Sequence, residues 1–504
     1  MRFVSTRGSS VDAVSFTAAV LEGSYARDGG MLMPEKIPQL TSDVLESWRK
    51  LRYRDLCKEV LRLFVDENEL STTDLDEIFE TAFESFDDPV EVVHLEELLN
   101  TGVFVAELWH GPTRAFKDVA LQPVARVFEK LLEKTGKKAV VLVSTSGDTG
   151  GATIESLKAS KRCHTICLFP LGRVTEIQRL QMTVPARSSQ RIHVYGVEGT
   201  SDDADVPVKE LVMDPLLVAK HGLTIFNSVN VARILLQIPM FVYAYLKVSP
   251  PGESAVVEVV VPTGGAGCLT AGVLAFSMGV PISLVPCTNS NDVAFQVFKS
   301  GRFFPKKDVA RTHSSAMDIL VPYNLERIFF LLSGLDGAVV RTVMQRFEGG
   351  DSVALPDQIV RPMKDVVPDA FCCSEETTIE TMRSSKDIRK IENEIRDILR
   401  QVTASVTFLP CLDTQSSKDI RKIENEIRDI LRQVTASVTF LPCLDTRCSF
   451  EILVFTKAND EGLLPPNWGD TDEKKIQNPQ SVTFKNFTTG IHKVDSCVTY
   501  KMDD

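Results

Sequence analysis

The sequence has few of the features typical of secreted, membrane-spanning or nucleic-acid-binding proteins. Its 504 residues contain no Cys-x-x-Cys pair, and the 11 cysteines are scattered, which argues against a disulfide framework or a zinc knuckle. No apolar run approaches the ~18 residues of a membrane span, since the nearest, residues 255–262, is broken by Glu258. A basic excess is also lacking, because 56 Lys and Arg are outnumbered by 68 Asp and Glu. We therefore expect neither nucleic acid nor membrane as a partner.

Several common enzyme signatures are missing as well. The sequence has no Gly-x-x-x-x-Gly-Lys-Ser/Thr phosphate loop and no Gly-x-Ser-x-Gly nucleophile elbow. The seven histidines are scattered without metal-ligand spacing, so we expect no metal site. The first eight residues lack the apolar core of a leader peptide, and reduced cysteines fit the cytosol. The predicted location is therefore cytoplasmic.

Residues 101–382 alternate short β-rich runs with helical ones. Residues 138–144, 164–170 and 282–286 have the apolar pattern of buried strands, and residues 151–160 and 268–278 that of helices. Such alternation predicts an α/β domain whose parallel sheet is covered by helices on both faces. Residues 1–100 show helical spacing of apolar positions and are interpreted as a helical N-terminal lobe.

The last part of the chain contains a duplication. Residues 384–414 recur letter for letter as residues 416–446, with Gln415 between the copies. A period in this range is typical of repeat proteins. Two undiverged copies favour a recent duplication or an assembly error over a solenoid. We treat residues 384–504 as a separate segment.

Lys117 is the first candidate for catalysis. It stands at the start of a helical pattern in which Pro123 is assigned to the first turn. The positive end of a helix dipole and burial both lower the pKa of a lysine, and a partly neutral amine can attack an aldehyde. The alternative is an ordinary surface lysine.

Two glycine-containing turns each join a strand to a helix. Residues 143–152 and 260–268 carry small residues where backbone N–H groups could bind an anion. Two anion sites and one amine favour a phosphorylated aldehyde cofactor and an anionic substrate. The alternative is a pair of tight turns that bind nothing.

Many blocks in the first 382 residues resemble the threonine synthase family, which comprises pyridoxal-phosphate enzymes of fold type II, the tryptophan synthase β-like fold. The match runs through Ser5-Thr-Arg-Gly8, Asp28-Gly-Gly30, Leu108-Trp-His-Gly111, Ala115-Phe-Lys-Asp118, Thr145-Ser-Gly-Asp-Thr-Gly150, Val197-Glu-Gly-Thr-Ser-Asp202, Asn227-Ser-Val-Asn230, Val261-Pro-Thr-Gly264, Ser315-Ala-Met-Asp-Ile319 and Val321-Pro-Tyr-Asn324. The resemblance implies an N-terminal lobe over residues 1–100 and a catalytic domain over residues 101–382.

The resemblance also implies roles for individual residues. Lys117 is expected to hold pyridoxal 5'-phosphate covalently and to act as the catalytic base. Cofactor contacts are expected from Gly264, Gly265, Ala266, Gly267, Cys268 and Asn230. Substrate contacts are expected from Ser146, Gly147, Asp148, Thr149 and Asn227.

The implied reaction is the elimination of phosphate from O-phosphohomoserine or a similar phosphorylated amino acid. Threonine synthases then add water to give threonine, whereas the threonine synthase-like relatives resemble phospho-lyases that release a 2-oxo acid, ammonia and phosphate. We favour the lyase, and the residues leave both outcomes open. A homodimer is a family expectation.

The chain departs from the family in two places. Cys268 stands where the phosphate loop usually ends in asparagine. The resemblance stops near residue 382, and no Pro-His dipeptide of the family's next block occurs. We therefore expect the last element of the catalytic domain to be missing and the activity to be impaired.

Residues 384–504 instead resemble the C-terminal half of the HORMA-domain spindle-checkpoint family, an α+β fold. The resemblance is carried by the run Ile395-Arg-Asp-Ile-Leu-Arg-Gln-Val-Thr-Ala-Ser-Val-Thr-Phe-Leu-Pro410, which recurs at residues 427–442, and by Cys448-Ser-Phe-Glu-Ile-Leu-Val-Phe455, Pro466-Asn-Trp468 and Phe487-Thr-Thr-Gly-Ile-His-Lys-Val494. The alternatives are therefore a non-catalytic interaction protein, which would allow a nuclear location, and a chimeric gene model. Because the first half of that domain is absent, we expect no tight peptide partner for this segment.

Overall fold

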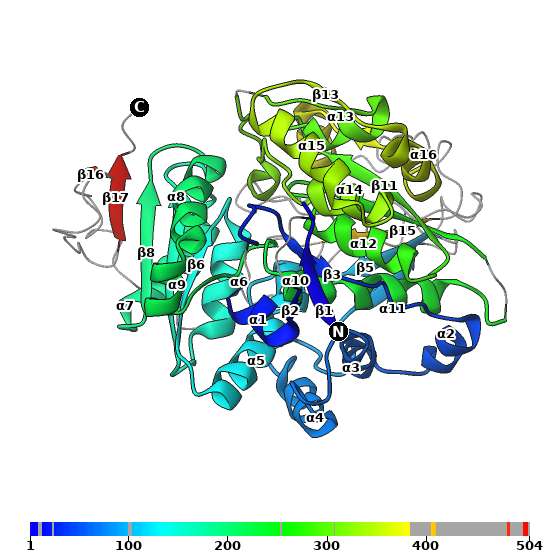
Figure 1. Cartoon of the computed structure of the whole chain (residues 1–504), viewed down its shortest axis with the longest axis horizontal. Coiled ribbons are helices and arrows are strands. Elements are labelled where there is room, and N and C mark those ends of the chain that lie inside the picture. The colour runs from blue at the N-terminus through cyan, green and yellow to red at the C-terminus, as the bar shows by residue number, and fades with distance from the viewer. Residues whose placement is uncertain are drawn as a thin grey trace.

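A computed structural model describes residues 1–8, 13–22, 25–98, 103–252, 255–306, 308–383, 405–409, 481–483 and 497–501. Two six-stranded sheets form the centre of this part of the chain. They lie in two α/β halves that stand side by side, with the N-terminal strands between them (Figure 1). The predicted α/β class with parallel sheets is confirmed for the described residues.

The first sheet is entirely parallel. Its order is β16 (Ser481–Thr483), β17 (Cys497–Lys501), β8 (Ile192–Val197), β7 (Cys163–Pro170), β6 (Ala139–Ser144) and β9 (Leu223–Ile225). The central strands are apolar along most of their length because helices cover both faces. These helices include α6 (Asp148–Leu157), α7 (Glu176–Arg187), α8 (Ser201–Met213) and α9 (Pro215–His221).

The second sheet is parallel except for one edge hairpin. Its order is β14 (Phe371–Cys372), β11 (Ile282–Thr288), β10 (Val257–Pro262), β15 (Ser405–Leu409), β5 (Val103–Glu107) and β4 (His94–Leu98). Only β4 runs antiparallel, against β5. The helices packed here include α11 (Ile238–Val248), α12 (Gly267–Ser277), α13 (Val293–Ser300) and α16 (Asp357–Val366).

Strand β15 comes from the first copy of the duplicated segment. Thr407 is in register with Val260 of β10 and with Val105 of β5, so β15 joins these two strands within one sheet. From the same tail, β17 pairs with β8 at the edge of the first sheet (Figure 1). We expected the catalytic domain to lack its last strand; in the structure β15 lies in the middle of its sheet. Of the HORMA-like blocks, residues 405–409 of the first run are described, as β15, and the blocks at 448–455, 466–468 and 487–494 lie outside the described residues.

The N-terminal residues form a small antiparallel sheet with a group of helices. Strands β1 (Arg2–Ser5), β2 (Val14–Ser15) and β3 (Leu32–Pro34) pair in the order β2-β1-β3. The helices are α1 (Phe16–Leu21), α2 (Ser42–Trp48), α3 (Tyr53–Arg62) and α4 (Thr72–Thr81), in agreement with the predicted helical lobe. The boundary that we placed at residue 100 falls between the two strands of the β4–β5 hairpin.

A buried ion pair fastens this lobe to the catalytic part. The Arg7 Nη2 atom lies 3.0 Å from Oε2 of Glu326 and 2.6 Å from Oε1 of Glu348. Glu326 belongs to α14 (Leu325–Leu332) and Glu348 to α15 (Gly337–Glu348). The attraction of the two carboxylates outweighs burial and raises the pKa of Arg7 above its usual range. The residues that follow strand β1 are thus bonded to helices more than 300 residues away.

The predicted strands and helices of the central region are confirmed, with one local correction. Helix α5 (Lys117–Thr135) begins at Lys117 as expected, but Pro123 lies inside the helix rather than in its first turn. The remaining described elements are α10 (Val231–Leu235), β12 (Arg302–Phe303), the 3-10 helix η1 (Ser315–Met317), β13 (Val353–Ala354) and α17 (Glu375–Arg383).

We expected no apolar run to approach the length of a membrane span, but residues 231–248 are a helical stretch long and apolar enough, by length and composition alone, to cross a membrane. This stretch comprises α10 and α11, and 89% of it is buried inside the protein. Packing in the core between the lobes accounts for its apolar composition.

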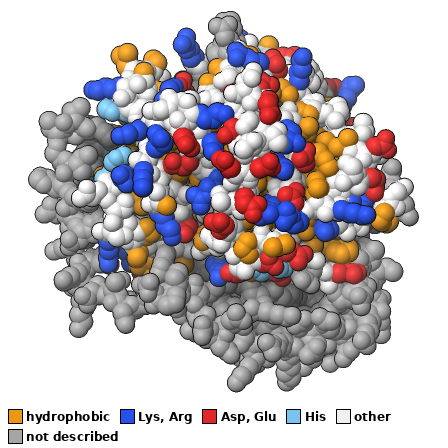
Figure 2. Space-filling model, turned by 90° about the horizontal axis from the view of Figure 1, so that it is seen from below, with side chains coloured by type: hydrophobic (Ala, Val, Ile, Leu, Met, Phe, Trp, Pro, Cys, Tyr) orange, Lys and Arg blue, Asp and Glu red, His pale blue; other side chains and the backbone are white. Residues whose placement is uncertain are grey.

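The surface of the described residues carries charges of both signs. On the face seen from below in Figure 1, Lys and Arg side chains alternate with Asp and Glu side chains (Figure 2).

Candidate active site

The carboxyl ends of β6 and β10, one strand from each large sheet, open onto one cavity. It encloses about 740 Å³, part of which is open to solvent. Loops that follow parallel strands are the usual place for a ligand in α/β proteins. The predicted site residues that line this cavity are Lys117, Ser146, Thr149, Asn227, Gly264, Gly265, Ala266, Gly267 and Cys268.

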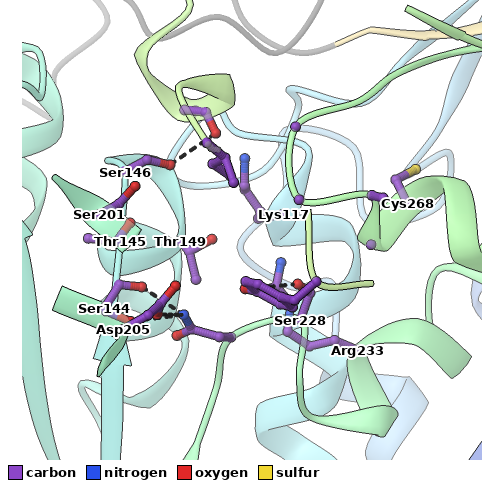
Figure 3. Close-up of a pocket in the computed structure, with 18 of the residues that line it drawn as sticks. Lys117, Ser144, Thr145, Ser146, Thr149, Ser201, Asp205, Ser228, Arg233 and Cys268 are labelled. Atoms are coloured by element: carbon purple, nitrogen blue, oxygen red, sulfur yellow. Dashed lines mark hydrogen bonds between the residues drawn. The ribbon is translucent and has the colours of Figure 1, made fainter. Parts of the chain in front are cut away.

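Lys117 lies inside the cavity at the first position of α5. Figure 3 shows it between Ser146 and Thr149 on one side and the loop that ends at Cys268 on the other. Burial lowers the pKa of Lys117 to about 8, while the Asp148 carboxylate opposes this shift and Arg233 adds to it. At pH 8 about half of such amines are neutral and able to act as nucleophile or base.

The turn before Lys117 is fixed by the next residue, Asp118. Its fully buried carboxylate accepts hydrogen bonds from the backbone N–H of Thr113, at 2.7 Å, and from the Thr113 hydroxyl, at 2.9 Å. Gly111 is required here, because a Cβ atom on it would lie 2.4 Å from Cβ of Asp118. Residues 111–118 therefore form a rigid turn that holds the start of α5 and Lys117 in place.

Asp148 and Gly147 lie behind the cavity wall rather than on it. The Asp148 Oδ2 atom is 3.3 Å from Nζ of Lys117, and its Oδ1 atom accepts a 2.6 Å hydrogen bond from Gln178 Nε2. Gly147 has φ +141°, and a Cβ on it would lie 2.2 Å from the Gln178 amide. The two residues predicted as substrate contacts instead support the loop and the lysine.

The loop from β10 to α12 has the form of an anion cradle. Ala266 adopts φ +60° as the N-cap, so the first backbone N–H groups of the 11-residue helix α12 have no side-chain cap. A Cβ on Gly267 would lie 2.9 Å from Cβ of Ser228, and one on Gly264 would lie 3.0 Å from the Met317 backbone. Uncapped N–H groups at a helix N-terminus fit a phosphate, so these residues are suited to hold a phosphorylated cofactor.

Cys268 closes this cradle with a neutral thiol. Burial raises its pKa to about 12, against the opposing effects of Lys117 and Arg233. The thiol is therefore protonated at ordinary pH and adds no negative charge beside the anion cradle. It replaces the stronger hydrogen-bonding amide that the family resemblance led us to expect at this position.

Two charged residues of the cavity were not predicted. Asp205 of α8 accepts a short hydrogen bond from the Ser144 hydroxyl, and burial raises its pKa to about 7 (Figure 3). Arg233 of α10 is 3% exposed, and its Nε atom has no hydrogen-bond partner among the described residues. An arginine within the apolar stretch 231–248 is the signal that could have identified it.

Asn227 and Asn230 have different roles although both follow β9. Asn227 lines the cavity and donates a 2.9 Å hydrogen bond to the Ser144 carbonyl oxygen. Asn230, which we predicted as a cofactor contact, does not line the cavity. It caps α10 by accepting from the Ala232 N–H and donates to carbonyl oxygens of Val20 and Ile225. Its contacts are those of a structural residue.

Comparison with known proteins identifies relatives of this chain. Residues 2–83 match the family model described as threonine synthase N terminus. The chain is 43% identical over 385 residues to human threonine synthase-like 2, covering 76% of this chain and 78% of that protein.

Two solved structures share the fold. The crystal structure of threonine synthase from yeast superimposes with a TM-score of 0.72 and 28% identity, over 88% of this chain and 96% of that one. The structure of PLP-bound threonine synthase from Brucella melitensis gives 0.71 and 29% identity, over 88% and 97%. The predicted family resemblance over the first three-quarters of the chain is confirmed, and this chain belongs to the threonine synthase family.

Proposed function

We propose that this chain is a pyridoxal-phosphate-dependent lyase that eliminates phosphate from O-phosphohomoserine or a closely similar phosphorylated amino acid. The observation that carries the proposal is the joint presence, in one cavity, of the buried amine of Lys117 and the uncapped N-terminus of α12. When bound, the cofactor supplies an aldehyde that condenses with amines and a ring that withdraws electrons from the substrate's α-carbon.

The chain's own residues have two roles, to hold the cofactor and to accept a proton. The N–H groups of the Gly264–Cys268 loop and α12 hold the cofactor phosphate, and Lys117 holds the aldehyde end. With cofactor and substrate bound, the free Nζ of Lys117 would accept the proton from the substrate's α-carbon. A pKa of about 8 suits an amine that must be neutral to accept this proton and cationic afterwards.

The substrate's two anionic groups have candidate partners on the opposite wall. Ser146 and Thr149 lie at the N-terminal end of α6, and Ser201 lies at that of α8. Helix α6 has no side-chain cap at this end, whereas α8 is capped by Thr200, whose side chain accepts from the Asp203 N–H, so on α8 the candidate partner is the Ser201 hydroxyl itself. Arg233 adds a buried positive charge to the cavity, which favours a doubly anionic substrate over a neutral amino acid.

The test follows the release of phosphate and the identity of the product. Purified protein loaded with pyridoxal phosphate should release phosphate from O-phosphohomoserine, with a 2-oxo acid and ammonia as products. Threonine among the products would assign the synthase outcome instead. In the Lys117→Ala variant, borohydride should no longer fix the cofactor to the peptide that contains residue 117. The exposed Lys158→Ala variant is the control and should behave like wild type.

The rival function is a peptide-binding HORMA-type interaction protein built on residues 384–504. The described tail strands support the enzyme instead, because β15 and β17 pair with the sheets of the catalytic part. A calorimetric titration of the full chain with a checkpoint-type peptide separates the two functions. Binding at micromolar affinity or better would favour the rival.

A further inference from the structure

The β4–β5 hairpin brings one histidine next to a glutamate and a second histidine that lie 13 and 16 residues further along the chain. His94 on β4 is the register partner of Glu107 on β5, and His110 follows three residues after Glu107. One potential metal-ligating atom from each of the three lies within 4.8 Å of the others. None of the three lines the cavity that contains Lys117, so the cluster is separate from the proposed active site.

One nitrogen of this cluster lacks a partner. The Nε2 atom of His110 lies 2.7 Å from Oε2 of Glu107, and the His94 and His110 rings are 4.3 Å apart between centroids. The Nε2 atom of His94 is buried and has no hydrogen-bond partner among the described residues. Buried polar atoms are normally satisfied, so this one calls for a partner that protein atoms do not provide.

A further carboxylate stands behind His110. The Nδ1 atom of His110 lies 3.6 Å from Oδ2 of Asp87, and Arg114 pairs with the same carboxylate. Histidines that bind metals usually have their second ring nitrogen next to a carboxylate or carbonyl, which fixes the tautomer and raises the basicity of the ligating nitrogen. The cluster therefore has both the ligands and the supporting partner of a metal site.

We propose that His94, Glu107 and His110 form a binding site for a divalent transition metal of the Zn²⁺ type. Two imidazoles and one carboxylate are a common set of three protein ligands for Zn²⁺, and water can fill the fourth position. Ca²⁺ and Mg²⁺ fit poorly, because they require mostly oxygen ligands. We expected no metal site because the seven histidines show no metal-ligand spacing along the chain; the hairpin register creates this cluster.

The position of the site gives it a structural role. It ties edge strand β4 to β5 and to the beginning of the turn that leads through Gly111 and Thr113 to Lys117. A metal that binds the folded state and not the unfolded one stabilises the fold by mass action. Zn²⁺ should therefore raise the melting temperature without being required for the chemistry at Lys117.

The test measures Zn²⁺ binding to the full chain by calorimetry and by metal analysis after dialysis. Wild-type protein should bind one equivalent that the His94→Ala variant does not bind, or binds at least tenfold more weakly. His164→Ala is the matched control, because His164 stacks on His193 at 6.2 Å in the other sheet and should leave binding unchanged. His94→Ala removes the orphaned ligand but leaves the Glu107–His110 pair intact, so the hairpin should still fold.

Cysteines elsewhere could also bind zinc, and Co²⁺ distinguishes them. Thiolate ligands give Co²⁺ an intense near-ultraviolet charge-transfer band, whereas a site of histidine and carboxylate gives only weak visible bands. We expect the weak visible bands, their loss in His94→Ala, and a Zn²⁺-dependent rise in melting temperature in wild type alone. Equal binding by wild type and His94→Ala, or no binding by either, would overturn the proposal and leave a plain hydrogen-bonded pair between Glu107 and His110.

Discussion

Nζ of Lys117 lies 3.3 Å from Oδ2 of Asp148, and both side chains are more than nine-tenths buried. The pair is not isolated, because Gln178 donates to the other oxygen of the same carboxylate. Asp148 thus holds the lysine and offsets part of the burial that lowers its pKa. The balance between burial and this one carboxylate sets the fraction of neutral amine in the site.

The Asp148→Asn variant tests this balance. Removing the negative charge takes away the interaction that favours the charged amine, so the pKa of Lys117 should fall further below about 8. The neutral form gains population as pH rises through the pKa, so the half-maximal rate of covalent cofactor capture by the apoprotein should move to lower pH. We expect a shift of about one unit or more, since a close opposite charge commonly contributes this much.

The rate of cofactor capture can be followed by absorbance between pH 6 and about 9, a range that spans the expected pKa. Asp351→Asn is the control, because that carboxylate is half exposed and pairs only with Arg346 among the interactions described. A shift to higher pH in Asp148→Asn would contradict the assigned role of this carboxylate.

The ion pair between Arg7 and Glu326 should be important for stability. Arg7→Ala would leave the Glu326 carboxylate buried with only the Thr6 hydroxyl as a described side-chain donor. Breaking a buried pair by removing one partner typically costs about 3–5 kcal/mol. Urea denaturation should show a loss of this size in the free energy of unfolding.

A matched exposed pair provides the comparison. Arg361 and Asp357 are both 82% exposed, and such pairs contribute little because water screens them. Arg361→Ala should therefore leave the urea midpoint unchanged. Equal effects of the two substitutions would mean that the N-terminal strand is not held by Arg7.

Two glycines of the phosphate cradle should respond differently to alanine. A Cβ on Gly267 would lie 2.9 Å from Cβ of Ser228, whereas one on Gly265 would lie 3.6 Å from a flexible Ile319 methyl group. Overpacking of this kind costs about 1–3 kcal/mol. If that cost falls on the bound state, Gly267→Ala should weaken cofactor binding by about 5–150-fold, since 1.4 kcal/mol is a factor of ten.

Equilibrium dialysis with pyridoxal phosphate measures both affinities. Gly265→Ala should bind within a few-fold of wild type, because its new methyl group makes an ordinary contact. Loss of binding in both variants would indicate that backbone flexibility of the loop, rather than the packing of Gly267 on Ser228, sets the affinity.

The sequence was sufficient to predict the central strands and the place of Lys117 at the start of a helix, for a physical reason. Parallel strands such as β6 and β10 are buried on both faces, so their residues are apolar in unbroken runs, and the following glycine turns are visible in the sequence. Motif blocks then assigned Lys117 to the cofactor. The start of α5 was predicted correctly and the bounds of α12 to within one residue, whereas α6 begins and ends three residues earlier than the predicted helix 151–160.

Long-range pairing could not be predicted from the sequence. Asp205 enters the cavity only because α8 packs around it, and its local sequence resembles that of an ordinary helix. Arg233 stands out as an arginine in an apolar stretch, but the sequence does not show that the packing of α10 brings it into the cavity. The cluster of His94, Glu107 and His110 depends on strand register, which a histidine count does not encode. Nor could the pattern of residues 384–414 reveal that a strand within it pairs with β10 and β5.

That pairing leads to a prediction about the duplicated tail. Thr407 lies in the middle of β15 between β10 and β5, and proline there has no N–H to donate and disrupts a central strand. Each ladder hydrogen bond lost costs about 0.5–1.5 kcal/mol. Thr407→Pro should therefore lower the melting temperature and weaken cofactor binding.

The duplication supplies an unusually close control, because Thr439 has the same neighbours in the second copy. Among the described residues, the first copy supplies the strand that pairs with β10 and β5, so we expect Thr439→Pro to have the smaller effect in the same thermal-denaturation and dialysis measurements. Residue 383 is followed by 21 residues before β15 but by 53 before the equivalent segment at 437–441. Loop-closure entropy then favours pairing of the first copy over pairing of the second by about fourfold, because the closure probability varies as the 3/2 power of the ratio of these lengths.

Since the two segments are identical, the second copy could replace a damaged first one. The double variant Thr407→Pro/Thr439→Pro should therefore lose more thermal stability than the two single variants combined. A double variant as stable as wild type would mean that the tail does not complete this sheet.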